Sequence, residues 1–245
     1  MSNKEKFDKI FYPIFYLVFS VGIAISACFI YQKFGFLSFY VSGQSMRPTL
    51  LGDNNSFHYG IADTTKAAIN TTKRFDVVVT YYSWVSEDEN LKVKRAWGLP
   101  GETISLTYNV TTDSMTFTAS INNEVRYTVE SEPKSNYQMP YGDKTTYQVF
   151  KFKAASRVFN VVANDGARTF ENHVLGQDEY FVMGDNWAHS SDCYGTNVTY
   201  KQMRNLHKSE IVGKVVRIEG TATSYDSDSK TLSGKSPYKH PMYIF

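Results

Sequence analysis

Cysteine is nearly absent from this chain of 245 residues, which contains only Cys28 and Cys193. Cys28 lies inside an uncharged run and Cys193 lies far downstream in a polar segment, so we expect no disulfide between them. The chain also lacks any long run of Lys or Arg, and its 26 basic and 24 acidic residues leave a formal net charge of +2. Nucleic acid is therefore not expected as a partner, because binding it requires concentrated positive charge.

Metal-binding and common hydrolase motifs are also missing. The five histidines, at positions 58, 173, 189, 207 and 240, show no HxH, HExxH or Cys-His spacing, so we expect no metal and no other cofactor. There is no GxSxG motif, and no His/Asp pair can be assigned by spacing. A Ser-His-Asp triad therefore has no support in the sequence.

One long apolar stretch is present near the N-terminus. Residues 10–31 are 22 positions without a charge, and a helix of this length reaches roughly 33 Å, enough to cross a bilayer. Residues 1–9 contain three lysines against one Glu and one Asp, which predicts a cytoplasmic N-terminus and an extracytoplasmic remainder of the chain. Three alternatives remain open: a signal cleaved near Ala24-Ile25-Ser26, a lipobox ending at Cys28, and a buried helix of a soluble protein. The length of the run and the Tyr and Phe residues at both ends favour a retained single-pass anchor.

After this stretch the pattern changes to short alternating or apolar runs. They predict strands at residues 36–41, 75–82, 103–108, 115–121, 125–129, 147–152, 158–162, 179–183 and 211–218. Turn signals at Asn122-Asn123, Tyr141-Gly142-Asp143 and Asp165-Gly166 predict hairpins. We therefore expect a mainly β protein with an antiparallel architecture, no long helix after the anchor, and a polar, flexible tail over residues 221–245.

Three polar stretches contain candidate catalytic residues. The first is SGQSMRPTL at residues 42–50, soon after the apolar stretch. A serine hydroxyl needs a base within hydrogen-bond reach to act as a nucleophile. The second stretch is KVKRAWGLPGE at residues 92–102, in which strand alternation places Lys92 and Lys94 on one face. A buried lysine can lose its charge and serve as that base, whereas a lysine on the strand surface cannot. The third stretch, YFVMGDNWAHSSD at residues 180–192, predicts a strand end and a polar loop.

Taken singly, each stretch also fits an ordinary strand or loop, but their order along the chain is informative. Ser-Met-x-Pro-Thr, then Lys-Arg-x-x-Gly-x-Pro-Gly, then Met-Gly-Asp-Asn with Ser-x-Asp resembles the bacterial type I signal peptidases. The resemblance implies that Ser45 is the nucleophile, that Lys94 is the general base and that Ser190 positions the lysine. It further implies that Asp185 and Asp192 shape the site without transferring protons.

The resemblance extends over nearly the whole chain and implies its organisation. It implies a catalytic β core of residues 34–105 and 176–220, with residues 106–175 as a β-rich insertion. The implied activity is that of a membrane-anchored serine endopeptidase, which removes N-terminal signal peptides from secreted precursors after small-x-small sites. Its partners are then precursor proteins and the lipid bilayer. A catalytically dispensable accessory protein for surface-protein or pilus assembly is the alternative, and a β-rich binding domain without enzymatic activity is a third interpretation.

The chain departs from the family pattern at three places. Cys193 and Tyr194 follow Asp192 where the family commonly has Ser and Arg, and Trp187 stands where an Arg is often found. An ion pair between Asp192 and an arginine of that loop is therefore in doubt. Gly43 occupies the position at which some members carry a serine that supplies a second oxyanion donor.

Overall fold

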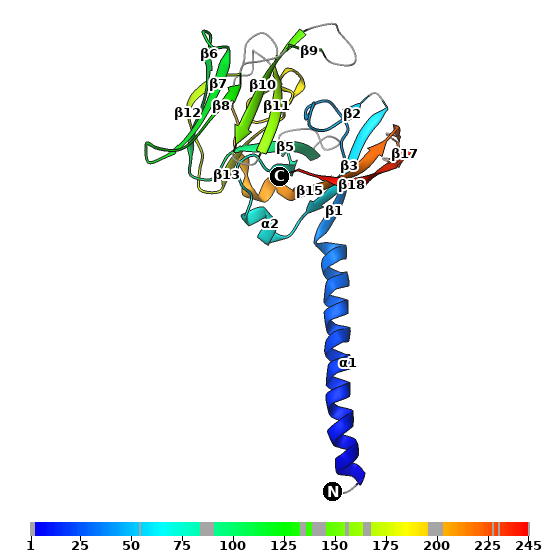
Figure 1. Ribbon diagram of the computed structural model, residues 1–245. Helices are drawn as coiled ribbons and strands as arrows, with labels where there is room; N and C mark the ends of the chain where they lie inside the picture. Colours follow the sequence, from blue (N-terminus) through cyan, green and yellow to red (C-terminus); the bar gives the residue numbers. More distant parts are fainter. Residues whose placement is uncertain are drawn as a thin grey trace.

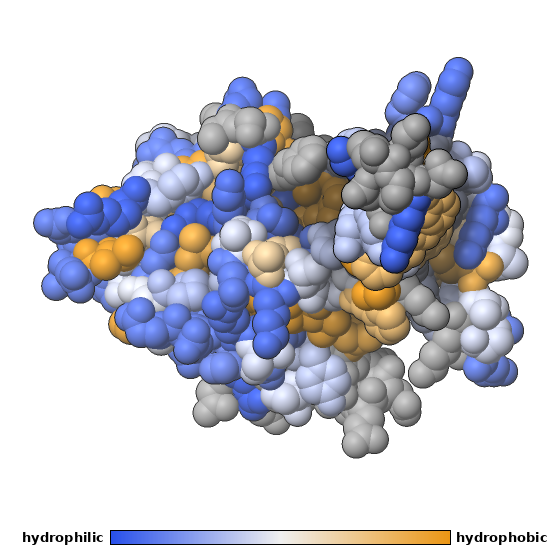
Figure 2. Space-filling view, turned by 90° about the horizontal axis from the view of Figure 1, so that it is seen from below, coloured by the Kyte–Doolittle hydropathy of each residue, from blue (hydrophilic) through white to orange (hydrophobic). Residues whose placement is uncertain are grey.

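The computed structural model describes residues 3–53, 55–83, 91–132, 136–138, 146–154, 157–163, 168–195, 203–226, 228–229 and 231–244. Its N-terminal part is a single helix, α1 (Asn3–Phe34), that stands away from a β-rich body (Figure 1). Within α1, the 23 residues Lys9–Tyr31 are long and apolar enough to cross a membrane, and none of this stretch is buried against the rest of the chain. Viewed along α1 from below, hydrophobic residues gather on and around the helix, whereas the surface over the second sheet is mostly hydrophilic (Figure 2).

The first sheet is antiparallel and contains the segments that precede and follow the candidate site residues. Its main path has the order β1-β3-β15-β4-β5-β13-β14, with β18 paired to β15 and β2 to β3. These strands are β1 (Phe36–Tyr40), β2 (Gly52–Asp53), β3 (Ser56–Asp63), β4 (Val77–Tyr81), β5 (Leu91–Gly98), β13 (Glu179–Met183), β14 (Leu206–His207), β15 (Ile211–Ala222) and β18 (Ser236–Tyr243). Three short helices connect them: α2 (Lys66–Asn70), η2 (Trp187–His189) and η3 (Lys208–Glu210).

The second sheet contains the strands between β5 and β13. Its order is β11-β10-β8-β7-β6-β12, with β9 paired to β10. The strands are β6 (Thr103–Asn109), β7 (Ser114–Ile121), β8 (Glu124–Glu132), β9 (Asn136–Gln138), β10 (Thr146–Ala154), β11 (Arg157–Ala163) and β12 (Phe170–Val174). The Asn122-Asn123 hairpin is confirmed, because both residues have positive φ and join β7 to β8. The other two predicted turns lie outside the described residues.

One aromatic core connects the two sheets. The Trp97 ring of β5 packs against Phe117 of β7 with ring centroids 5.2 Å apart, and against Phe152 of β10 at the same separation. Phe75 and Trp187 contact the same indole at 5.1 and 5.9 Å. The predicted mainly β, antiparallel fold is therefore confirmed, and the second sheet, from Thr103 to Val174, shares its core with the first. The division of the chain into a catalytic core and an insertion at residues 106 and 175 stays a prediction.

The C-terminal segment contains strands that the sequence analysis did not predict, and its flexibility stays a prediction. The described part of residues 221–245 is not an irregular tail: β16 (Ser224–Asp226) pairs with β17 (Thr231–Ser233), and β18 pairs with β15. β4 pairs with β15 only as far as Lys214, and β18 pairs with the part of β15 from Arg217 to Thr221. β18 is held by backbone hydrogen bonds to the part of β15 that β4 does not pair with. The sequence did not reveal this strand, because the side chains of β18 are largely exposed and form no apolar pattern.

Candidate active site

The loop that carries Ser45 follows β1 and is anchored by its own apolar side chains, which are buried in the core. Met46 and Leu50 are fully buried, and the Leu50 amide donates to the Met46 carbonyl at 2.9 Å. Gly43 has a φ of +111°, in the region that favours glycine, and its amide donates to the carbonyl of Gly52. Anchoring of the neighbours leaves Ser45 partly exposed at the rim of the core.

Lys94 reaches Ser45 from strand β5. Its Nζ lies 2.7 Å from Ser45 Oγ, and its side chain is 1% exposed. Burial lowers the pKa of Lys94 to about 8, because desolvation penalises the ammonium form more than the nearby Asp192 favours it. The interpretation of Lys94 as a surface lysine is therefore wrong. From Lys94 to Gly98 both faces of β5 are buried, because the second sheet and the Ser45 loop cover it.

Asp185 follows β13 and connects three segments of the site. Its buried carboxylate accepts two hydrogen bonds from Arg95, from Nε at 2.8 Å and from Nη2 at 2.5 Å. It also accepts a hydrogen bond from the hydroxyl of Thr49, in the Ser45 loop. Asp185 thus ties β5 to the loop that carries the candidate nucleophile. The sequence analysis did not identify Arg95, although it directly follows Lys94.

The residues on either side of Asp185 contact the backbone of Ser45. The Asn186 amide donates to the Ser45 carbonyl at 3.0 Å, and the Asn186 side chain donates to the Gln44 carbonyl at 3.1 Å. At Gly184, a Cβ atom would lie only 2.2 Å from the Ser45 carbonyl oxygen and 2.3 Å from Ser190 Oγ. The Gly-Asp-Asn turn therefore packs directly on the nucleophile loop, and position 184 has no room for a side chain.

Ser190 lies near these residues but does not make the expected contact. It ends η2, is 4% exposed, and its Oγ has no hydrogen-bond partner among the described residues. The lysine Nζ contacts Ser45 Oγ, whereas Ser190 Oγ lies close to Gly184. A role of Ser190 toward the lysine stays a prediction.

Asp192 has an arginine partner that the sequence analysis did not find. Its Oδ1 accepts a hydrogen bond from Arg168 Nη1 at 2.6 Å, and its Oδ2 accepts one from the Gly184 amide at 3.0 Å. Asp192 thus forms an ion pair with an arginine, but that arginine does not come from the loop that contains Asp192. Arg168 lies in the segment just before β12. The adjacent Cys193 is a buried free thiol whose pKa is raised by desolvation, and Cys28 is also free.

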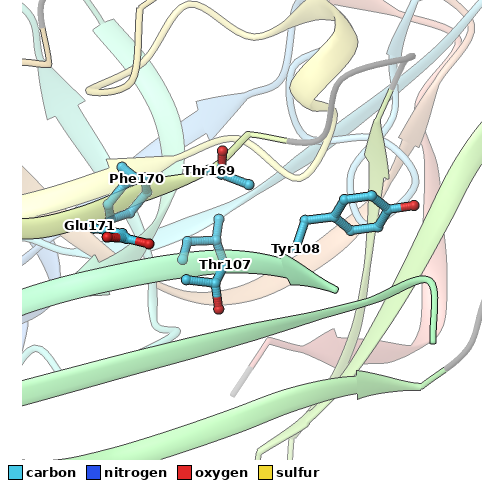
Figure 3. Close-up of a pocket in the computed structure, with 6 residues that line it drawn as sticks. Thr107, Tyr108, Thr169, Phe170 and Glu171 are labelled. Carbon is cyan, nitrogen blue, oxygen red and sulfur yellow. The ribbon is translucent and has the colours of Figure 1, made fainter. Parts of the chain in front are cut away.

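No described cluster suits a metal ion: within the described ranges, no three His, Cys, Asp or Glu side chains gather in a way that could hold one. A separate pocket of about 390 Å³ lies between β6 and the start of β12. Figure 3 shows its lining, which includes Tyr108, Thr169 and Glu171 but none of the candidate catalytic residues. The candidate active site is therefore the Ser45–Lys94 pair and not this pocket.

Two comparisons with known proteins show which family the chain belongs to. Residues 14–218 match the family described as signal peptidase, peptidase S26, so the chain belongs to this family. The chain is also 28% identical over 204 residues to signal peptidase I of Pseudomonas aeruginosa, an alignment that covers 78% of this chain and 63% of that protein. The chain thus spans less than two thirds of the length of this relative. The family resemblance inferred from the three polar stretches is confirmed.

Proposed function

We propose that this protein is a membrane-anchored serine endopeptidase that removes N-terminal signal peptides from secreted precursors, with Ser45 as nucleophile and Lys94 as general base. The observation that carries the proposal is the 2.7 Å contact between Ser45 Oγ and the Nζ of a buried lysine. Membership of the signal peptidase family and the name of the relative support the choice of substrate.

The reaction follows from the two side chains. Neutral Lys94 Nζ accepts the Ser45 proton while Oγ attacks the carbonyl carbon of the scissile peptide bond. When the tetrahedral intermediate collapses, the C–N bond breaks, the lysine returns the proton to the leaving amine, and an acyl-Ser45 ester remains. Water, deprotonated by the same lysine, then hydrolyses the ester. With a pKa of about 8, roughly a tenth of the lysine is neutral at pH 7.

Stabilisation of the oxyanion is assigned to the backbone amide of Ser45. Gly43 has no side chain to donate a hydrogen bond, and its own amide is already bonded to the Gly52 carbonyl. Removal of a single oxyanion donor in comparable sites costs about 3 kcal/mol of transition-state stabilisation. The backbone conformation of residues 43–46, which sets the direction of the Ser45 amide, therefore contributes to the rate in addition to the serine hydroxyl.

The anchor proposal depends on the apolar part of α1 and on the position of Ser45 soon after the helix ends at Phe34. A signal peptide is itself held in the bilayer, so an enzyme anchored in the same bilayer meets its substrate at the surface. We assign the N-terminus to the cytoplasm because basic residues are in slight excess before the apolar stretch. The preference for small residues before the cut comes from the family resemblance.

The test is cleavage of a precursor with a small-x-small site in lipid vesicles, with the cut bond mapped by mass spectrometry. Ser45→Ala and Lys94→Ala are expected to lose at least about a thousandfold in rate. Lys153→Ala is the control, because Lys153 is also a strand lysine but is exposed on β10 of the second sheet; it should cut at the same bond at nearly the normal rate. Continued cutting at that bond by the Ser45 and Lys94 variants would refute the dyad.

The accessory-protein alternative is not favoured. A dispensable site is expected to lack the serine or the lysine, whereas here both are present and in contact. A serine-directed acylating probe separates the two functions, because an accessory protein would leave Ser45 unlabelled.

A further inference from the structure

Arg168 crosses from the second sheet to the loop that contains Ser190 and Asp192. It lies in the segment before β12, is 8% exposed, and its Nη1 donates to Asp192 Oδ1 at 2.6 Å. Its Nη2 donates to the carbonyl of Trp187 at 2.9 Å and to that of Ser190 at 3.1 Å. One guanidinium group therefore holds both ends of η2 and the carboxylate that follows.

The ion pair between Arg168 and Asp192 is largely removed from water. The Asp192 side chain is fully buried and that of Arg168 is 9% exposed. Loss of one member of a buried pair leaves an uncompensated charge in a region of low dielectric, which is far more costly than loss of a surface ion pair. Removal of Arg168 thus exposes its neighbours to the full charge of Asp192.

Lys94 is one of the neighbours that such a change affects. Two carboxylates, Asp192 and Asp185, favour its charged form, whereas Arg168 and Lys92 disfavour that form. Asp185 is matched by Arg95 and Asp192 by Arg168, so each buried carboxylate near the lysine has its own guanidinium partner. Other titratable groups near this cluster include Tyr82, Cys193 and Glu210, and the ring of Tyr194 lies 4.9 Å from Arg168 Cζ.

We propose that Arg168 is a positioning residue of the active site: it compensates Asp192 and holds loop 187–194, so that the amine of Lys94 stays uncharged beside Ser45. The inference rests on the proposed function, because it concerns the same Ser45–Lys94 pair. Through Arg168 the second sheet contributes to the active site. The loop around Asp192 contains no arginine, and Arg168, 24 residues before Asp192 in the sequence, takes that role.

The test compares the pH dependence of kcat/KM for the wild type, Arg168→Gln, Arg168→Lys and a control, Arg157→Gln, in the full-length protein. Arg157 also joins the two sheets, through Asp76 at 2.6 Å and the Arg74 carbonyl at 2.7 Å, but lies outside the site. We expect Arg168→Gln to move the acid limb about one pH unit higher and to reduce kcat/KM at pH 7 about tenfold. Arg168→Lys keeps the charge and should restore most of the wild-type limb, and Arg157→Gln should leave the limb unchanged.

A double variant separates charge compensation from a loss of folding. Asp192→Asn removes the charge that Arg168 compensates, so Arg168→Gln combined with Asp192→Asn should return the acid limb toward its wild-type position. The proposal is overturned if Arg168→Gln lowers kcat/KM equally at every pH, or if Arg157→Gln shifts the limb equally. If the limb is unchanged while Ser45→Ala and Lys94→Ala are inactive, only this inference fails; active Ser45 and Lys94 variants would instead refute the proposed function.

Discussion

Lys94 shows how the environment of one residue is set by opposing contributions. Desolvation disfavours its ammonium form, and the charge of Asp192 favours it. Desolvation dominates, because the lysine is fully buried whereas the carboxylates near it are already paired with Arg168 and Arg95. A shift of the pKa from 10.5 to about 8 corresponds to about 3 kcal/mol in favour of the neutral amine.

At the scale of this residue we predict the pH profile of the wild type. Since Lys94 must be neutral to accept a proton, kcat/KM should rise about tenfold per pH unit up to about pH 8 and then level off. Steady-state cleavage of a short peptide between pH 6 and 9.5 measures this limb. Lys94→Arg should be inactive throughout, because a guanidinium does not deprotonate in this range. A rate that is constant over the whole interval contradicts the assignment of Lys94 as the base.

Among the elements, β3 and β18 are connected by a histidine. His58 of β3 accepts a hydrogen bond at Nδ1 from the Leu51 amide at 3.1 Å, so its proton belongs on Nε2, which lies 2.9 Å from the Tyr238 hydroxyl of β18. Burial, together with the nearby Arg47, lowers the pKa of His58 to about 4. The neutral ring therefore links the C-terminal strand to the core of the first sheet.

This link predicts a loss of stability in acid. The pKa of His58 is lower in the folded than in the unfolded chain, so the stabilisation is complete above about pH 6.5 and is lost as the pH falls toward 4. At pH 5 we expect a loss of about 1–2 kcal/mol, after allowance for the part of the ring that solvent reaches. Thermal unfolding in detergent at pH 7 and pH 5 measures it. His58→Gln should reduce the difference between the two pH values.

His240 provides the control for this prediction, because it is an exposed histidine on β18, the strand that contains Tyr238. His240→Gln should leave the loss between pH 7 and pH 5 as it is in the wild type. An equal effect of the two substitutions would assign the acid sensitivity to histidine content in general and not to the contact between His58 and Tyr238.

For the whole molecule, the structure separates a single N-terminal helix from a β-rich body that contains Ser45 and Lys94. α1 makes few contacts with the β-rich part, and its described side chains are exposed along its length (Figure 1). The core that positions Lys94 lies entirely in the two sheets. The chemistry at Ser45 should therefore depend little on the helix, whereas encounter with a membrane-held substrate should depend on it strongly.

Deletion of residues 1–33 tests this separation. We expect kcat/KM for a short soluble peptide in detergent to stay within about threefold, and cleavage of a precursor in vesicles to fall more than tenfold, because confinement of both partners to one bilayer raises their effective concentration. Replacement of residues 10–31 by an unrelated apolar helix is the control and should restore cleavage in vesicles. Equal losses for the peptide and the precursor would show that the helix supports the active site itself.

Much of the fold follows from local pattern, and the exceptions have identifiable causes. The strand predicted at residues 179–183 matches β13, and the apolar N-terminal helix and most second-sheet strands lie close to where the apolar pattern predicts them. β3 was missed because its polar residues Ser56, His58 and Asp63, together with Gly60, weaken the apolar alternation. In the sheet, a Cβ at Gly60 would lie 2.3 Å from the Arg217 carbonyl oxygen, so the close approach of β15 requires glycine at this position. The same glycine interrupts the apolar alternation by which a strand is predicted.

The sequence by itself determined the apolar helix, the alternating strands, and a serine and a lysine in motifs that indicate their chemistry, since periodicity and residue type are local properties. Only the tertiary structure decided that Arg168 pairs with Asp192, that Ser190 faces Gly184, and that the polar C-terminal segment completes a sheet. These are contacts between distant segments. The partner of a strand and the partner of a buried charge lie in distant parts of the sequence, so local patterns of residue type do not predict them.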